Sequence, residues 1–111
     1  KGRRLQQEFR KLLIEKLKIH PEDIESRSMG AGGEDLIMAR AARIAFPYSI
    51  ECKNVEKLNV WEAYKQAKEN SKDYEPLVVM KKNNQKALVV LDAEHFVQIY
   101  QDWTHDVTNK D

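Results

Sequence analysis

The chain has 111 residues, of which 41% are hydrophobic and 33% charged. A composition of this kind excludes a disordered tail and, with this length, predicts one folded domain over residues 1–111. The 19 Lys and Arg residues nearly balance the 18 Asp and Glu residues, so a protein that binds nucleic acid through a large overall positive charge is excluded too.

The N-terminal segment is predicted to be an amphipathic helix from Gly2 to about Ile19. Leucine and phenylalanine side chains recur in it at helical spacing, with arginines and lysines between them. Pro21 ends this helix, because the residue before a proline is disfavoured in the α conformation. A weak strand is expected at 23–28, and the glycine-rich segment 29–33 (MGAGG) predicts a loop.

Two further strands are expected before the second helix. The first covers residues 35–39, and residues 40–44 form a connecting turn or a short helical piece. Over residues 46–53 apolar and polar side chains alternate, which is typical of a strand with one buried face. The buried face is expected to hold Tyr48, Ile50 and Cys52.

A second helix is expected from Asn59, its N-cap, to about Ser71. Its buried stripe is predicted to consist of Val60, Trp61, Tyr64 and Ala67. The β-rich segments 76–82 and 87–91 are joined by Asn-Asn-Gln and predict a hairpin.

A last helix is predicted over about residues 93–103, with Asp92 as its N-cap, and residues 104–111 are expected to fray. The order of elements indicates an α/β protein in which a central mixed β-sheet is flanked by helices.

Three charged residues stand out within the predicted strands: Asp35, Glu51 and Lys53. Glu51 and Lys53 are two residues apart on one strand, so their side chains share a face and lie roughly 6–7 Å apart. If the strand that Asp35 opens is a neighbour, Asp35 and Glu51 converge on one divalent cation. Oxygen ligands of this kind suit Mg²⁺ or Mn²⁺, and a lysine beside the ion can activate water or stabilise charge on a phosphate. A solvated strand face is the alternative interpretation of the Glu-x-Lys triplet taken alone.

The segment 33–35 (Gly-Glu-Asp), followed by 51–53 (Glu-Cys-Lys) and a helix that carries Gln66, resembles the PD-(D/E)xK nuclease superfamily. The resemblance covers about residues 3–91. It implies a restriction-endonuclease-like core in αβββαβ order, to which this chain adds a strand and a C-terminal helix. A narrower resemblance is to small Holliday-junction-resolving and phage-type endonucleases, which are near this length and usually dimeric.

The resemblance implies five catalytic residues: Asp35, Glu51, Lys53, Glu8 and Gln66. The carboxylates of Asp35, Glu51 and Glu8 are the expected Mg²⁺ or Mn²⁺ ligands. Two alternatives stay open, namely Glu34 in place of Asp35 and Glu15 in place of Glu8. Glu8 and Gln66 are also compatible with ordinary solvated helix residues.

Contacts to DNA are expected from local groups of positive charge, because the net charge is only +1. The candidates are Arg3, Arg4, Arg10, Arg27, Ser28, Arg40, Arg43 and Lys57. Backbone amides of the 29–33 loop can bind phosphate as well, with a plain turn as the alternative interpretation.

Cys52 is the only cysteine, which excludes an internal disulfide and a cysteine-based zinc site. Its place on the apolar face of a strand favours a buried side chain over a nucleophile. No apolar stretch approaches the roughly 20 residues that cross a bilayer, and no signal peptide precedes the first helix, so we expect no membrane partner. A cytoplasmic location follows, and the resemblance implies a bacterial or phage protein.

The residues and the resemblance together predict a Mg²⁺- or Mn²⁺-dependent endonuclease that acts on DNA. Branched DNA, such as a Holliday junction, is implied by the resemblance alone. The alternatives are a general DNA-repair or restriction-type nuclease and a non-catalytic nucleic-acid-binding module on the same fold. A symmetric junction needs two active sites, so we expect a two-fold homodimer, with the apolar residues of 96–103 as its candidate contact.

Overall fold

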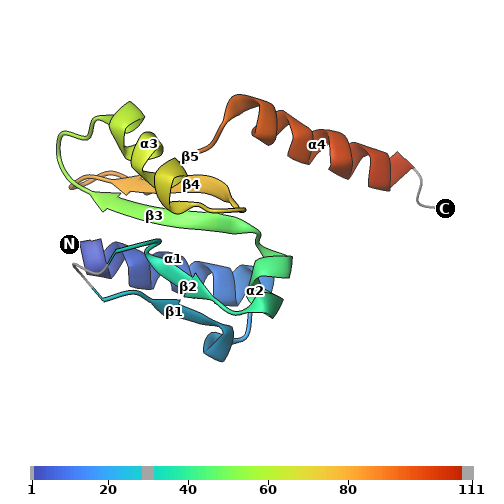
Figure 1. Cartoon of the computed structure of the whole chain (residues 1–111), viewed down its shortest axis with the longest axis horizontal. Coiled ribbons are helices and arrows are strands. Elements are labelled where there is room, and N and C mark those ends of the chain that lie inside the picture. Colours follow the sequence, from blue (N-terminus) through green and yellow to red (C-terminus); the bar gives the residue numbers. More distant parts are fainter. Residues whose placement is uncertain (1, 29–31, 109–111) are drawn as a thin grey trace.

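In the computed structural model (Figure 1), helices α1 (Gly2–Leu17) and α3 (Val60–Asn70) lie on opposite faces of a three-stranded sheet. Strands β3 (Tyr48–Asn54) and β4 (Glu75–Lys81) are parallel and are connected through α3, whereas β5 (Leu88–Val90) is antiparallel to β4. A parallel pair with a helical crossover and an antiparallel edge strand make a mixed sheet. The predicted α/β fold, with a mixed sheet between helices, is confirmed at this level.

The other two strands form a sheet of their own. Strands β1 (Ile24–Ser26) and β2 (Leu36–Met38) pair in antiparallel orientation, and neither belongs to the ladder of β3, β4 and β5. The link between the two sheets lies at Asp35, whose backbone N–H donates to the Ile50 carbonyl oxygen at 2.8 Å. The expectation of one central sheet is therefore corrected to two small sheets that meet beside β3.

The structure describes residues 2–28 and 32–108 and contains three further elements. A single 3₁₀ turn, η1 (Pro21–Asp23), precedes β1. The connection predicted as a turn or short helix is helix α2 (Arg40–Ala45), and the C-terminal element is helix α4 (Ala93–Thr108). None of the helices in the described part of the chain is long and apolar enough to cross a membrane.

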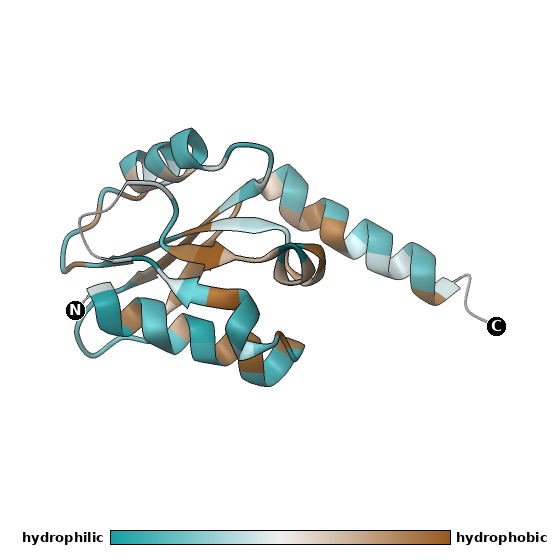
Figure 2. Cartoon of the chain, turned by 60° about the horizontal axis from the view of Figure 1, so that its bottom comes forward, coloured by the Kyte–Doolittle hydropathy of each residue, from teal (hydrophilic) through white to brown (hydrophobic). Residues whose placement is uncertain are grey.

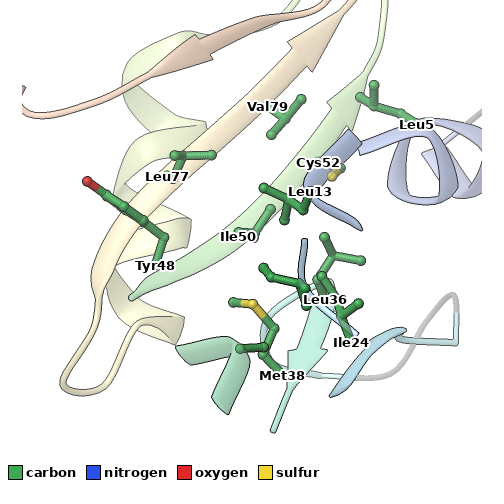
Figure 3. Close-up of a cluster of buried hydrophobic side chains, with 12 residues drawn as sticks. Leu5, Leu13, Ile24, Leu36, Met38, Tyr48, Ile50, Cys52, Leu77 and Val79 are labelled. Carbon is green, nitrogen blue, oxygen red and sulfur yellow. The ribbon is translucent and has the colours of Figure 1, made fainter. Parts of the chain in front are cut away.

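The core lies between α1, the β1–β2 pair and one face of the larger sheet (Figure 3). Tyr48, Ile50 and Cys52 of β3 point into it, as the alternating pattern predicts, and Leu77 and Val79 of β4 continue the same face. The other members come from the surrounding elements: Leu5, Leu13, Ile19, Ile24, Leu36, Met38 and Ala42. Residues 48–52 are all buried because β3 is covered on both faces.

A smaller cluster joins α3 to the opposite face of the sheet through Ala63, Ala67 and Val78. Asn59 caps α3 as predicted, because its Oδ1 accepts the Glu62 N–H at 3.1 Å. The predicted stripe is wrong at Trp61, whose side chain is 87% exposed.

Position 61 lies about 100° around the helix from position 60 and falls outside the stripe of alanines that contacts β4. Small side chains at positions 63 and 67 let α3 approach the sheet closely, and this leaves no space for an indole.

The C-terminal helix also departs from expectation. Asp92 caps it, with Oδ1 accepting the His95 N–H at 3.0 Å, but helix α4 continues to Thr108 where fraying from 104 onward was expected. Residues 109–111 lie outside the described part of the chain. No residue of α4 is buried, and Figure 1 shows the helix leaving the body of the protein at the end of the sheet opposite the β4–β5 connection.

Candidate active site

A cavity of about 350 Å³ opens where the N-terminal end of α1, β3 and the last turns of α3 meet. Four of the five predicted catalytic residues line it, together with Ser28 and the glycines that follow the 29–31 segment. These four are Asp35, Glu51, Lys53 and Gln66. The residues that line the cavity come from four separate parts of the sequence: the start of α1, the segment around Asp35, β3 and α3.

Asp35 is fixed to the edge of β3 by two hydrogen bonds. Its backbone N–H donates to the Ile50 carbonyl oxygen at 2.8 Å, and its Oδ2 accepts the Cys52 N–H at 2.6 Å. Asp35 therefore supplies hydrogen-bond partners to two successive backbone groups on the edge of β3, although no full strand pairs with that edge. This places the carboxylate of Asp35 beside the segment that carries Glu51 and Lys53.

A buried amide holds the same carboxylate from the side of α1. The Gln6 side chain is only 3% exposed; its Oε1 accepts a hydrogen bond from Ser26 Oγ at 2.5 Å. Since that oxygen is engaged as an acceptor, the NH₂ group is the donor in the hydrogen bond between Gln6 and Asp35. A chain from Ser26 through Gln6 to Asp35 orients the carboxylate.

Glu51 lies on the face of β3 that α3 covers, and it is 4% exposed. Asn70, the last residue of α3, donates from Nδ2 to Glu51 Oε1 at 3.0 Å. The Asn70 backbone carbonyl in turn accepts a long hydrogen bond of 3.5 Å from Ser49 Oγ. The end of α3 is thereby joined to β3 at Ser49 and Glu51.

The electrostatics of the cavity are set by two acids, the half-buried Asp35 and the buried Glu51, which share a lysine. Burial raises the pKa of Asp35, against the opposing effect of the Cys52 N–H, Lys53 and Gln6. Burial also raises the pKa of Glu51, and the negative charge of Asp35 raises it further, while Asn70 and Lys53 lower it. Two carboxylates held close together in a partly desolvated site favour either a shared proton or a bound cation.

The donor set fits an oxygen-preferring ion. Within the described residues, no group of three or more His, Cys, Asp or Glu side chains is arranged to hold a metal. Two carboxylates are nonetheless what Mg²⁺ commonly takes from a protein, with water completing its coordination, whereas Zn²⁺ prefers three or four nitrogen and sulfur ligands. Asp35 and Glu51 are the residues of the cavity able to hold Mg²⁺ or Mn²⁺.

Cys52 contributes its backbone rather than its thiol. The side chain points into the core, and burial raises the pKa of the thiol well above its usual range. A protonated, buried thiol is a poor nucleophile, which agrees with the predicted structural role.

The structure does not bring Glu8 to the cavity. Glu8 is exposed on α1, and the alternative Glu15 is exposed as well, 3.9 Å from Lys11. The α1 residues that line the cavity are Gly2 and Gln6, and the side chain of Gln6 lies about 200° around the helix from that of Glu8.

Glu34, the alternative to Asp35, is engaged elsewhere. Its carboxylate forms an ion pair with the Arg43 guanidinium, and its backbone carbonyl accepts a hydrogen bond from Arg27 Nε at 2.5 Å. Asp35 is thus the acid of the 33–35 segment that faces the cavity.

The predicted DNA contacts divide into two groups. Three of the arginines form hydrogen bonds within the protein. Arg10 donates to the backbone carbonyls of Ile24 and Pro21, and Arg27 donates to the backbone carbonyl of Glu34. Arg43 donates to the Glu34 carboxylate, and its guanidinium lies 4.3 Å from the centre of the Tyr74 ring. The others are exposed: Arg3, Arg4, Ser28, Arg40 and Lys57. Of the 29–33 loop, residues 29–31 lie outside the described part of the chain.

Two positioning residues, Gln6 and Asn70, are absent from the sequence-based set. Gln6 had a detectable signal, since it falls on the apolar stripe of α1, three residues before Phe9 and seven before Leu13. A polar residue at a buried position is the informative kind of exception. Asn70 carries no such signal, because its role depends on where α3 ends above β3.

No protein-family model, curated protein or solved structure matches the chain.

Proposed function

We propose that this protein is a Mg²⁺- or Mn²⁺-dependent endonuclease that hydrolyses DNA phosphodiester bonds. The observation that carries the proposal is the meeting of Asp35, Glu51 and Lys53 in one cavity. Buried carboxylates that repel one another lower the stability of the folded protein unless a cation or a proton compensates them. A structural role alone gives no reason to place both acids and a lysine on one wall of an open cavity.

Each residue has a distinct part in the proposed reaction. Asp35 and Glu51 hold the ion, which when bound supplies Lewis-acid stabilisation of the developing phosphate charge. The Lys53 ammonium donates to the attacking water or to a phosphate oxygen and keeps it in line for attack. Gln6 and Asn70 also line the cavity, and their part is to orient the two carboxylates through hydrogen bonds.

The DNA backbone is proposed to approach along the exposed start of α1. Gly2 lines the cavity, and the side chains of Arg3 and Arg4, which follow it in the first turn, are exposed to solvent. Phosphates bound there would also benefit from the positive end of the helix dipole. Arginine contacts of this kind supply affinity without reading the base sequence.

Branched DNA is the proposed substrate class, and a two-fold homodimer is the proposed assembly, since a junction is cut at two symmetric positions. Both follow from the resemblance to junction-resolving endonucleases, as does the restriction-endonuclease-like arrangement of the core. Cleavage of a four-way junction, compared with linear duplex of the same sequence, distinguishes this substrate from that of a general repair or restriction-type nuclease.

The central experiment is nicking of supercoiled plasmid in Mg²⁺ or Mn²⁺ by the full chain and three variants. We expect Asp35→Asn and Lys53→Ala to lower the rate at least ~100-fold, since each removes a group that acts on the transition state. Glu8→Gln is the matched control, because it removes an exposed carboxylate of the neighbouring helix face and should leave the rate unchanged.

Two outcomes contradict the proposal. Equal nicking by the wild type and both cavity variants would show that the activity arises elsewhere. A wild type that binds DNA but nicks none in either metal would identify a non-catalytic nucleic-acid-binding module. Calorimetric titration with Mn²⁺ in the absence of DNA provides a separate readout, and Asp35→Asn should weaken that binding while Glu8→Gln should not.

A further inference from the structure

We propose that helix α4 of one copy docks in a lysine-rimmed groove at the opposite end of a second copy, so that two chains exchange their C-terminal helices. The proposal does not depend on the nuclease assignment, because it requires neither DNA nor metal. It rests on two complementary features, a helix without a partner and a groove without an occupant among the described residues.

The helix carries one continuous apolar face, which we call the α4 stripe. It consists of Phe96, Ile99, Tyr100, Trp103 and Val107, which recur at spacings of three and four residues. Each of these side chains is between 37% and 61% exposed, and no residue of α4 is buried. Figure 2 shows brown segments along a helix that stands away from the rest of the protein. An amphipathic helix of this kind needs a second surface to cover its apolar side.

The first turn of α4 is attached to the body of the protein. His95 Nε2 is hydrogen-bonded to the Tyr48 hydroxyl at 2.6 Å, and the two rings meet edge to face. His95 Nδ1 also lies 3.7 Å from Glu75 Oε1. These contacts fix where α4 begins and leave its stripe, from Phe96 onward, facing solvent.

The second surface is a groove of about 510 Å³, which we call the hairpin groove. It lies between the segment after β3 and the β4–β5 hairpin, and the Asn83 N–H ties these two walls together by donating to Glu56 Oε2 at 2.6 Å. Apolar side chains such as Leu58, Met80 and Leu88 line its interior. Its rim carries four lysines: Lys57, Lys81, Lys82 and Lys86.

The two surfaces are complementary in charge. Residues 93–108 contain no lysine or arginine, and Asp102 and Asp106 lie along one edge of the α4 stripe. An acidic helix with an apolar face therefore matches an apolar groove with a lysine rim, whereas two acidic α4 helices packed on each other would bring like charges together. A volume of 510 Å³ also accommodates an indole or phenyl ring as an anchor.

The area is sufficient for a stable pair. Three half-exposed aromatic rings and two aliphatic side chains offer on the order of 450 Å² per helix, if a buried ring covers about 150–250 Å². The partner surface that covers each stripe buries a similar area, so two reciprocal contacts bring the total to roughly 1,800 Å², within the range of specific protein interfaces.

A helix cannot reach the groove of its own chain. The hairpin groove lies where β3 and β4 end, while α4 starts at the other end of the sheet and runs outward (Figure 1). Two chains lying side by side in opposite directions place each α4 beside the groove of the other. This arrangement is closed by a two-fold axis, so it stops at two chains.

The test is the mass of the full chain in solution without DNA or metal, by light scattering and by sedimentation. We expect the wild type to be a dimer, and Trp103→Glu and the double variant Lys82→Glu/Lys86→Glu to raise the dissociation constant at least tenfold. The control, Lys11→Glu/Lys16→Glu, reverses two exposed lysines of α1 and should remain dimeric. Circular dichroism checks that each variant keeps its fold.

A charge exchange sharpens the test. The variant Asp102→Lys/Asp106→Lys should also dissociate, since its helix then meets the lysine rim with like charge. Mixed with Lys82→Glu/Lys86→Glu, however, it should form a heterodimer in which both reciprocal contacts pair opposite charges. Recovery of dimer mass in the mixture, but in neither component alone, is the result that the proposal predicts.

Three results would overturn the proposal. The first is a wild type that is monomeric at 100-fold the concentration used for activity. The second is a Lys82→Glu/Lys86→Glu variant that stays dimeric while Trp103→Glu does not, because α4 would then bind a different surface. The third is a lysine variant that keeps its dimer but loses DNA binding, which would assign the hairpin groove to nucleic acid.

Discussion

The two faces of strand β3 differ in what they contribute to the molecule. Toward α1 the strand presents Tyr48, Ile50 and Cys52, which join the main core (Figure 3). Toward α3 it presents Ser49 and Glu51, which are just as buried but meet Asn70. Apolar burial on the first face stabilises the fold, whereas burial of a carboxylate on the second disfavours it. Because side chains alternate along this seven-residue strand, one face stabilises the fold and the other carries the polar groups of the cavity.

Breaking the apolar face should have the largest effect on stability. Ile50 is fully buried, so Ile50→Ala removes packed methyl groups and leaves a cavity in the core. We expect a loss of about 3–5 kcal/mol in the free energy of unfolding, measured by urea denaturation. Ile44→Ala is the matched control, because Ile44 is 74% exposed on α2 and its truncation should change stability by less than ~0.5 kcal/mol.

A substitution on the polar face should lower the affinity for metal more than it lowers the free energy of unfolding. Asn70→Ala removes the hydrogen bond to Glu51 Oε1, which leaves a buried carboxylate oxygen without that donor and raises the Glu51 pKa further. We expect a stability loss of about 1–3 kcal/mol and a Mn²⁺ affinity lowered roughly 10–100-fold.

Calorimetric titration and urea denaturation measure the two effects of Asn70→Ala separately. The control is Asn83→Ala in the exposed β4–β5 connection, because Asn83, unlike Asn84, does not have a left-handed backbone that alanine would strain. An unchanged Mn²⁺ affinity in Asn70→Ala would show that the end of α3 only packs against β3 and does not position Glu51.

The polar face should also give stability an unusual dependence on pH. The pKa values of Asp35 and Glu51 are raised above 3.8 and 4.5, so the folded state binds more protons than the unfolded state in that range. The contribution of these acids to stability is therefore fully present below their unfolded pKa values and is lost as the pH rises through the folded ones.

Urea denaturation of wild type and Glu51→Gln from pH 4 to pH 8, without metal, measures this contribution. The stability of the variant relative to wild type should increase with pH, because glutamine has no charge to bury. Addition of Mg²⁺ at pH 8 should stabilise the wild type and leave the variant nearly unchanged. Parallel pH curves for the two proteins would contradict the shared desolvation of Asp35 and Glu51.

The parts of this fold that could be read from the sequence are those fixed by local chemistry. The Asn59 and Asp92 caps, the alternation on β3 and the β4–β5 hairpin each depend on residues close together in the chain. The separation of five strands into two sheets depends instead on a long-range contact at Asp35, where two hydrogen bonds replace a strand pairing. No pattern within a short window contains that information.

The same distinction applies to the cavity. Asp35, Glu51 and Lys53 could be singled out because their residue types and spacing suggest a chemistry. The side of α1 that faces these residues could not be predicted from the sequence, because it depends on how the helix is rotated above β3. In the structure that side carries Gln6 and not Glu8. Arg10, Arg27 and Arg43 were indistinguishable by sequence from arginines that bind phosphate, yet their guanidinium groups bond within the protein.

The smallest expected effect concerns the residue for which the helical pattern was most misleading. Trp61 has the size and apolarity of a core anchor, but Ala63 and Ala67 carry the contact between α3 and the sheet, and the indole is 87% exposed. Trp61→Ala should therefore change the free energy of unfolding by less than about 0.5 kcal/mol, whereas Ala67→Trp should prevent α3 from packing. A loss of 3 kcal/mol or more in Trp61→Ala, the ~3–5 kcal/mol range of a buried tryptophan, would mean that α3 presents its other side to β4. Intrinsic fluorescence of a Trp103→Phe variant, in which Trp61 is the remaining tryptophan, gives an independent check, since a solvated indole at position 61 is accessible to iodide in the folded protein.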